Sequence, residues 1–501
     1  MKKMNLLAMS LVSAAALSFS SCSSNDDLTS GGGSNQSKVE SFYMTFAVQT
    51  PTSNGTRTQQ QTDKEPATAV ETKITSGTFY LVDQKTKETV FTKHITASEL
   101  NNATPESPAI GTTKSKIEVP VQDVKEGVTY IVYFLANTTD ATPWTSVFAP
   151  AADKFTATNK FDAGYATDNA FVMFNQNDKN SHADKYTVEF KAANKDISNA
   201  AKVSETIMLD RVTARIDKPE TEATSITAKY PEGADAKKKA AIDAEIAKVK
   251  TVTQSNYAIT NLSNKTNIMQ KWDDAWAALQ IPAGTEYMQK SGDLGDQWTL
   301  ANYGWFANAE KNYVFENTYV FENTKETATT MYFEYKLGLD GTKFTDTPDF
   351  TDGTFYRYNG VIYRSIAAIY KAYQDQPILF GGKTKEQLLA ELKTKTEGEG
   401  TAVKKTIGAT AAELAKFRKD NVIEVFVEGK TYYSQVITDK WLGTNTIQRN
   451  TVYQLNVKNI YNLGADVPNG KPDENKPMYY LDVEVSVNPW VLSTQDVNLG
   501  E

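Results

Sequence analysis

Short stretches in which apolar and polar residues alternate constrain this sequence more than any other feature. The stretch FYMTFAV is the clearest, because it places four large apolar side chains, Phe42, Met44, Phe46 and Val48, on one face of an extended chain. Similar segments follow at 77–83, 116–121, 128–137, 170–175, 186–190 and 205–217. Turn residues separate these segments, and no stretch with helical spacing lies between them. This order predicts an antiparallel β-sandwich rather than alternating strands and helices.

The second half of the chain mixes strand patterns with charged helical patterns. Because 501 residues are too many for one core, two or three domains are expected, the second beginning near Lys218. Its strand-like segments are interrupted by segments rich in Ala, Lys and Glu at 235–251, 383–396 and 410–421. We interpret these as solvated helical insertions on a β framework. The alternative is a basic partner-binding site at Lys237–Lys239.

The N-terminus has the layout of an export signal. Lys2 and Lys3 follow Met1, an uncharged run of apolar and small residues comes next, and Ser20 and Ser21 precede the only cysteine, Cys22. This predicts a signal peptide over 1–21 and a lipobox in which the thiol of Cys22 receives a diacylglyceryl anchor. The alternative is an ordinary secretory signal with a coincidental cysteine. The polar, Gly/Ser-rich residues 22–37 then form a lipidated flexible spacer.

Residues suited to catalysis or metal binding are sparse. The only histidines, His94 and His182, lie in unrelated polar contexts, and no glycine-rich phosphate loop follows a strand. The acidic residues of 346–353 miss the spacing of a calcium loop. The net charge of −8 argues against nucleic acid as a partner. We therefore expect no enzyme activity, no metal and no cofactor.

Four tryptophans fall close together in the second half, at Trp272, Trp276, Trp298 and Trp305. One interpretation is a helical or loop subdomain that packs its aromatic side chains. The other is a platform on which glycan rings stack. The sequence leaves both open.

Four longer stretches occur in order along the chain: SFYMTFAVQTPTSNGTR at 41–57, LDRVTARI at 209–216, QRNTVYQLNVKNIYNLG at 448–464 and LDVEVSVNPWVLSTQDVNL at 481–499. Together with the lipobox, they resemble the major fimbrillins of Bacteroidales type V pili, especially the short-fimbria (minor fimbria) subunit. Arg211 and Arg215 match arginine positions of that family. The resemblance covers both ends of the chain and the domain junction.

The resemblance implies a mainly β protein with two tandem transthyretin-like antiparallel β-sandwich domains and helical insertions in the second. It assigns 38–57 to a propeptide strand and cleavage loop, 58–217 to the N-terminal sandwich and 218–501 to the C-terminal sandwich with a terminal donor strand. In that family an arginine-specific surface protease removes the lipidated segment. A C-terminal strand of the next subunit then fills the groove.

Arg57 is suited to such a cut. It is the only arginine before Arg211, and it lies in a polar loop two residues after Gly55. Exposed loops are where proteolysis is productive. We therefore expect cleavage between Arg57 and Thr58, the alternative being a chance surface arginine.

The residues permit strand exchange independently of the resemblance. A sandwich that loses the strand containing 42–48 exposes unpaired backbone groups and an apolar trough, which invite another strand with the same alternation. One candidate row is Leu481, Val483, Val485 and Val487; the other, our choice of donor, is Trp490, Val491, Leu492, Val497 and Leu499. The alternative is that 481–499 is an internal strand of the second domain. Both hold if 481–487 is internal and 490–499 is donated.

The predicted function is that of a structural fimbria (pilus) subunit serving adhesion. Its expected partners are further copies of itself joined head to tail, accessory pilus subunits, the arginine-specific protease and, before processing, the outer membrane through the lipid. The alternatives are a monomeric, surface-anchored glycan-binding lipoprotein and an accessory or tip subunit of the same pilus. The sequence names no adhesion ligand.

Overall fold

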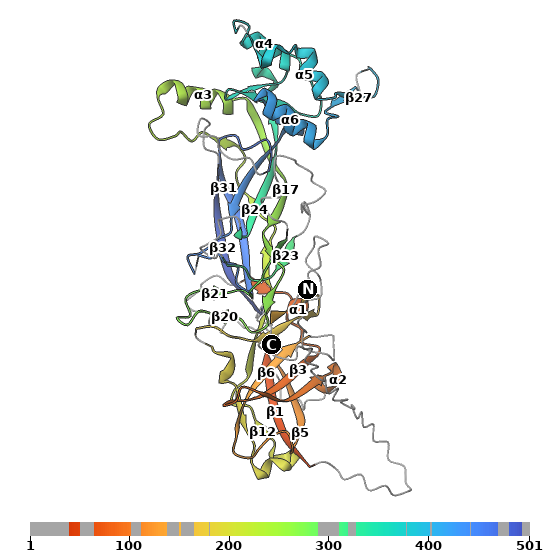
Figure 1. The fold of residues 1–501 in the computed structure, drawn as a ribbon, viewed down its shortest axis with the longest axis vertical. Helices are drawn as coiled ribbons and strands as arrows, with labels where there is room; N and C mark the ends of the chain where they lie inside the picture. The colour runs from red at the N-terminus through yellow and green to blue at the C-terminus, as the bar shows by residue number, and fades with distance from the viewer. Residues whose placement is uncertain are drawn as a thin grey trace, which may run out of the picture. The chain divides into compact units, whose positions relative to one another are not determined.

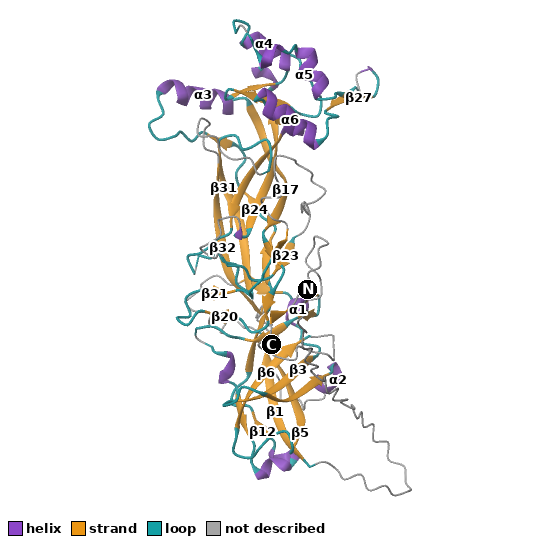
Figure 2. Ribbon diagram, viewed as in Figure 1, coloured by secondary structure: helices purple, strands orange, loops and turns teal. Residues whose placement is uncertain are grey.

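The computed structural model describes residues 40–50, 65–101, 112–137, 150–151, 165–179, 181–288, 310–318, 327–376, 378–400, 403–440, 442–468 and 480–492. All described strands and helices belong to one compact unit, Ser41–Glu501, and strands predominate among them (Figure 2). The predicted mainly β class is therefore confirmed.

The first sheet is built from the N-terminal strands (Figure 1). Its order is β12-β1-β13-β10-β6-β3-β4, with β5 beside β1 and β11 beside β6. These strands are β1 (Ser41–Gln49), β3 (Gly77–Asp83), β4 (Thr89–Ile95), β5 (Thr112–Pro120), β6 (Thr129–Ala136), β10 (Met173–Asn175), β11 (Thr187–Glu189), β12 (Ala201–Lys202) and β13 (Ile207–Arg211). The strands predicted at 77–83, 116–121, 128–137, 170–175 and 186–190 are thus present, some of them shorter than expected.

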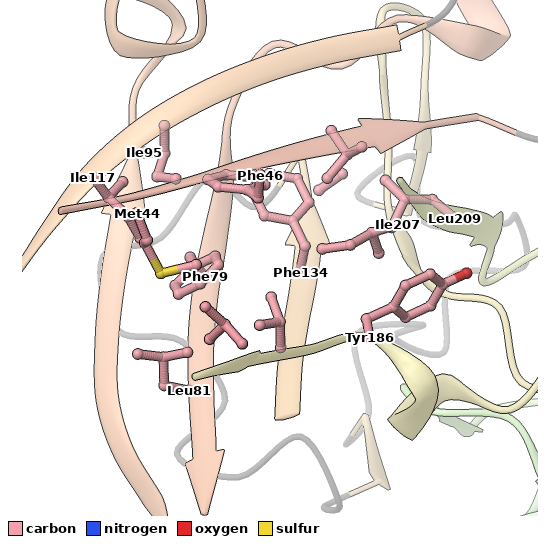
Figure 3. Packing of buried hydrophobic residues seen from close by; sticks show 14 of the residues in the cluster. Met44, Phe46, Phe79, Leu81, Ile95, Ile117, Phe134, Tyr186, Ile207 and Leu209 are labelled. Carbon is pink, nitrogen blue, oxygen red and sulfur yellow. The ribbon is translucent and has the colours of Figure 1, made fainter. Parts of the chain in front are cut away.

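The first core is apolar and lies between β1 and the strands facing it (Figure 3). Phe46 of β1 contacts Phe79 of β3 and Phe134 of β6, with ring centroids 5.0 and 5.6 Å apart. All three side chains are at most 4% exposed. The alternation of the sequence therefore specifies two packed layers, as a sandwich requires.

β2 and strands from β14 onward form a further pair of sheets over a second apolar core. One has the order β2-β32-β31-β14-β23, with β15 and β16 beside β31; the other has the order β17-β24-β30. The strands are β2 (Glu65–Ala67), β14 (Ala214–Asp217), β15 (Glu220–Thr221), β16 (Ile226–Thr227), β17 (Val249–Thr260), β23 (Lys311–Val314), β24 (Thr330–Leu339), β30 (Lys430–Val436), β31 (Thr451–Tyr461) and β32 (Tyr480–Leu492).

Small hairpins and short helices complete the described fold. The remaining strands are β7 (Pro150–Ala151), β8 (Ala166–Thr167), β9 (Ala170–Phe171), β18 (Leu262–Ser263), β19 (Thr266–Asn267), β20 (Lys271–Trp272), β21 (Leu279–Gln280), β22 (Tyr287–Met288), β25 (Phe355–Tyr358), β26 (Val361–Tyr363), β27 (Lys395–Glu397), β28 (Lys404–Thr406) and β29 (Glu424–Phe426). The helices are α1 (Ala69–Thr72), α2 (Ala97–Asn101), α3 (Ala236–Ile246), α4 (Ile366–Ala372), α5 (Lys385–Glu391) and α6 (Ala411–Asn421).

The three predicted helical segments are confirmed as α3, α5 and α6, but two of them are more than solvated insertions. Leu388 of α5 and Phe417 of α6 are buried in a separate core that also includes Ile369 of α4. Helices α5 and α6 each begin with a capping box, formed by Thr384 with Gln387 in α5 and by Thr410 with Glu413 in α6. The helices therefore form a small packed subdomain of their own.

The expectation of one strand over 205–217 was wrong. β13 pairs with β1 and β10 of the first sheet, whereas β14 pairs with β23 and β31 of the second. Val212 and Thr213 link the two strands, and the carbonyl of Thr213 accepts a hydrogen bond from the Asn450 amide at 2.8 Å. Residues with strand propensity continue across the link, so the pattern could not reveal that the chain changes sheets there.

Candidate functional site

β1 is an inner strand that is paired on both sides. Over its whole length it runs antiparallel to β5, from Ser41 opposite Pro120 to Gln49 opposite Thr112. On its other side it pairs in parallel with β12 at Met44 and with β13 at Val48. Loss of β1 would therefore leave unpaired backbone groups on two neighbours, facing each other across a gap one strand wide.

The four apolar residues predicted to share a face of β1 do so. Phe42, Met44, Phe46 and Val48 are at most 4% exposed, and the residues between them are half-buried. Phe42 contacts Phe190 with ring centroids 5.3 Å apart, at one end of the same core. Beneath β1 lies a floor of aromatic and aliphatic side chains (Figure 3). Removal of the strand would open an apolar trough with period-two binding positions.

Several predicted site residues fall outside the described ranges. These are the lipidation residue Cys22, the cleavage residues Arg57 and Thr58, and the donor residues Val497 and Leu499. For the other three donor residues, Trp490, Val491 and Leu492, the backbone is described.

The C-terminal strand β32 is continuous from Tyr480 to Leu492. It runs antiparallel to β31 from Tyr480, opposite Tyr461, to Pro489, opposite Thr451. Residues 481–487 are thus internal, as one of the alternatives expected. Beyond Pro489, the pairing changes: Trp490, Val491 and Leu492 lie in parallel register with Glu65, Pro66 and Ala67 of β2 in the same chain.

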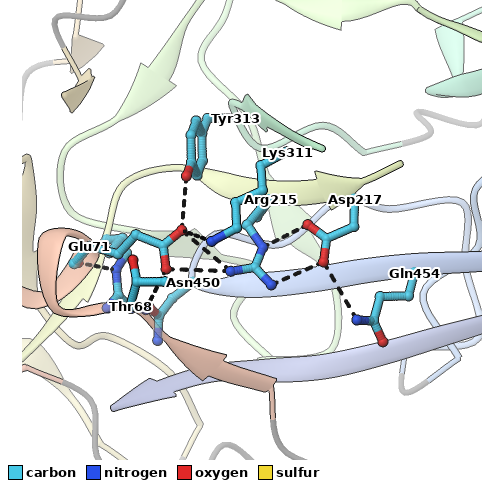
Figure 4. Close-up of polar contacts among 9 residues, drawn as sticks. Thr68, Glu71, Arg215, Asp217, Lys311, Tyr313, Asn450 and Gln454 are labelled. Atoms are coloured by element: carbon cyan, nitrogen blue, oxygen red, sulfur yellow. Dashed lines mark hydrogen bonds and ion pairs between the residues drawn. The ribbon is translucent and has the colours of Figure 1, made fainter. Parts of the chain in front are cut away.

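The segment that follows β2 is fixed by a buried carboxylate (Figure 4). Glu71 of α1 is fully buried and accepts hydrogen bonds from Tyr313 Oη at 2.8 Å, Lys311 Nζ at 2.9 Å and the Thr68 amide at 2.7 Å. Arg215 Nη1 lies 3.4 Å from it. Burial opposes ionisation of Glu71, but the bonds from Lys311 and Thr68 and the charge of Arg215 outweigh burial and lower its pKa to about 2.

Buried arginines and an asparagine join the two sheets around this carboxylate. Arg211, at the end of β13, donates from Nε to the Glu71 carbonyl at 2.8 Å and from Nη1 to Asn450 Oδ1 at 2.8 Å. Asn450 Nδ2 in turn bonds to Asp210 Oδ1 at 2.9 Å. Arg215 bonds from Nη2 to Asp217 Oδ2 at 3.0 Å. Arg211 and Arg215 were noticed in the sequence only as family positions, and their structural role is to tie α1 to both sheets.

Neither Glu71 nor Arg449 was predicted from the sequence to be important. Arg449 Nη2 lies 2.7 Å from Glu316 Oε2, both side chains being almost fully buried. Its Nη1 donates to the Ile268 carbonyl at 2.6 Å. The available signal was the Arg-Asn pair at the start of QRNTVYQLNV, since an arginine directly before an apolar strand needs a partner once it is buried.

The tryptophan group is described in part. Trp272 and Trp276 lie on the β20–β21 hairpin, and Trp298 and Trp305 fall outside the described ranges. Within those ranges, no group of three or more His, Cys, Asp or Glu side chains is placed to hold a metal ion. None of the described helices is long and apolar enough to cross a membrane.

The C-terminal strands match a known family. The model for the C-terminal part of fimbrillin, described as major fimbrial subunit protein type IV, matches residues 424–496, which begin with β29 and end four residues after β32. Over these residues the chain is similar to the C-terminal part of fimbrillin. No curated protein matches the chain significantly.

Several solved structures that match the chain come from fimbrial systems. Fimbrilin FimA from Porphyromonas gingivalis is 14% identical, the match covering 91% of this chain and 100% of that one, with a TM-score of 0.42. The tip fimbrial protein Mfa3 from the same species, with C-terminal truncation, is 12% identical over 90% and 100%, with a TM-score of 0.33. A fimbrial assembly protein from Parabacteroides distasonis is 12% identical over 60% and 82%, with a TM-score of 0.30.

Proposed function

We propose that this protein is a structural subunit of a cell-surface fimbria and not an enzyme. It is exported as a lipoprotein precursor, cut after Arg57 and polymerised by donor-strand exchange, and the resulting fibre serves adhesion. Its partners are further copies of itself, accessory pilus subunits and an arginine-specific surface protease. The family match at 424–496 supports the fimbrial role.

The observation that carries the proposal is the position of β1. It is the first strand of the compact unit, it fills an inner position of the first sheet, and its inward row is entirely apolar. A cut after Arg57 separates β1 from the chain that begins at Thr58, so β1 stays in place only through non-covalent contacts. An apolar, unpaired groove of this kind is recognised by strand addition.

The donor in our proposal is the chain from Trp490 onward. In the monomer, the backbone of Trp490–Leu492 forms three parallel pairs with β2, and parallel pairing is slightly weaker per residue than antiparallel pairing. The preceding residues of β32 stay paired with β31 when this end leaves. A donor in the C-terminal part of the chain and an acceptor groove in its N-terminal part give a head-to-tail contact that does not close on itself and therefore produces a filament.

Replacement of Arg57 tests the proposal directly. Arg57→Ala and the charge-conserving Arg57→Lys should both yield a lipidated, folded precursor that forms no fibres, because β1 still fills its own groove. Gln59→Ala, a control in the same loop, should be cut and should polymerise. Electron microscopy reports fibres, and mass spectrometry of the mature N-terminus should find Thr58. Fibres from uncut Arg57→Ala, or a mature N-terminus far from Thr58, would contradict the proposal.

Lipidation is tested separately through Cys22. Without its thiol the precursor cannot form the thioether, so Cys22→Ala should lose a fatty-acid label and leave the membrane fraction. Cys22 is the only cysteine of the chain, so no second thiol can substitute. A Cys22→Ala protein that still carries the label would refute the anchor but leave the strand-exchange mechanism standing.

A further inference from the structure

A hairpin from the second half of the chain is fastened to the first sandwich beside a cavity. Trp272 of β20 donates from Nε1 to the Asn177 carbonyl at 2.9 Å. Asn177 Nδ2 donates to the Gln270 carbonyl at 2.7 Å, and Asn177 Oδ1 accepts from the Ala183 amide at 2.9 Å. Asn177 thus uses its side chain and its carbonyl to hold the β20–β21 hairpin in place.

The tip of this hairpin presents Trp276 in an unusual backbone conformation. Its φ is +55°, in the left-handed region, which is a genuine outlier for a bulky side chain. The turn is closed by Asp273, whose carbonyl accepts from the Trp276 amide at 2.9 Å and whose Oδ1 accepts from the Ala277 amide at 2.6 Å. Strain of this kind is found at ligand-binding sites, where it holds a side chain in position.

The indole of Trp276 is oriented further by His182. The two rings stack with centroids 4.3 Å apart and an interplanar angle of 21°. Trp276 is half-buried and His182 is exposed, so this aromatic pair stands at the surface rather than in a core. A stack between the two halves of the chain keeps an aromatic surface rigid before any ligand arrives.

The cavity beside this pair has a volume of about 470 Å³, within the range of about 300–1,000 Å³ typical of small-molecule sites. Besides the stacked rings, it is lined by the apolar Met269 and by the charged Lys87 and Asp184. The latter two are exposed, and neither side chain forms a hydrogen bond or ion pair with another described residue. The site therefore offers an aromatic surface, an ammonium donor and a carboxylate acceptor together.

We propose that this cavity binds a saccharide, with one sugar ring against Trp276 and its hydroxyl groups bonded to Lys87 and Asp184. A sugar ring presents C–H groups, which pack on the electron-rich face of an indole, and hydroxyl groups, which both donate and accept hydrogen bonds. Opposite charges on Lys87 and Asp184 favour an uncharged sugar over an acidic or a basic one. This site takes no part in strand exchange. It lets each subunit bind a saccharide at its own surface.

The test uses the full-length protein in detergent on an array of mono- and oligosaccharides ending in neutral hexoses and N-acetylhexosamines, followed by calorimetric titration of the sugars that bind. Trp276→Gly removes the ring and suits the left-handed backbone. It should weaken binding at least tenfold without lowering the melting temperature. Asp184→Asn keeps the hairpin intact and should also weaken binding. Tyr230→Ala removes an exposed aromatic residue elsewhere and should leave sugar binding unchanged.

Two results would overturn the proposal: an array on which the wild-type protein binds none of the sugars, or binding by Trp276→Gly and Asp184→Asn that stays within twofold of wild type. If Trp276→Gly does not fold, Asp184→Asn decides alone. Both variants should still form fibres, so that failure of this site and failure of the fimbrial function are read from different measurements.

Discussion

β1 and the β2–α1 segment (Glu65–Thr72) stand on either side of the expected cut, yet different forces hold them in the fold. β1 contributes four buried apolar side chains and no charged residue. The β2–α1 segment contributes a buried carboxylate, Glu71, with several polar and charged partners. Apolar burial is non-directional, so any strand with the same alternation can replace β1. The Glu71 cluster needs particular partners at particular distances.

The segment before Arg57, β1, can therefore be exchanged for another strand, whereas the segment after it, β2–α1, stays in the fold. Once the chain is cut, β1 is separated from the rest, whereas the new N-terminal segment remains tied to both sheets through Arg211 and Arg215. β2 links this segment to the end of β32. The segment that stays therefore also contacts the segment that we propose as the donor.

The largest effect is expected from removing the residues that pair with β2, Trp490–Leu492. Deletion of 490–501 should leave a folded monomer, because β32 up to Pro489 stays paired with β31 and α1 stays held by Glu71. The truncated protein should accept a strand but donate none. It should therefore appear as a monomer in light scattering and should cap growing fibres of intact subunits.

Deletion of Gly500 and Glu501 alone is the matched control and should leave fibres normal. If the 490–501 deletion misfolds, the end of β32 is needed inside its own domain and the donor lies elsewhere. If it forms normal fibres, strand exchange through this terminus fails.

The second test compares the two faces of β1 in the uncut precursor. Phe46→Ala empties a site between Phe79 and Phe134 and should lower the free energy of unfolding by about 3–5 kcal/mol, as Phe-to-Ala changes in cores do. Tyr43→Ala, on the half-buried face of the same strand, should cost about 1 kcal/mol or less. Urea denaturation of both variants measures the difference. Equal losses would mean that the inward row does not hold β1.

The same two segments show which features of the fold could be predicted from the sequence and which could not. The face of β1 was predictable because residues 42, 44, 46 and 48 carry their own period-two signal. Glu71 was not, because its partners Arg215, Lys311 and Tyr313 are 144, 240 and 242 positions away and only the fold brings them together. The change of sheet after Arg211 was missed for the same reason. Local patterns specify strands and faces, whereas ion clusters and strand partners depend on tertiary contacts.

The remaining prediction sharpens the comparison through pH. In the unfolded chain Glu71 titrates near 4.5, and in the fold its pKa is about 2. A lowered pKa stabilises the fold fully above the unfolded value, and this contribution is lost as pH falls from about 4.5 towards 2. The difference corresponds to about 3 kcal/mol at neutral pH. β1 has no ionisable carboxylate, so its own contribution should not change over this range.

Glu71→Gln should therefore be less stable than wild type at pH 7, and the gap between the two proteins should narrow steadily below pH 4.5 in urea denaturation. Glu413 is the matched control. Hydrogen bonds from Lys393 and the Thr410 amide also lower its pKa to about 2, but it caps α6 at the surface, where solvent screens its charge. Glu413→Gln should have the smaller effect. A gap for Glu71→Gln that stays constant from pH 7 to pH 3 would mean that the shape of the side chain, and not its charge, fixes α1. The contrast between an apolar, exchangeable β1 and an ionically fixed α1 would then no longer hold.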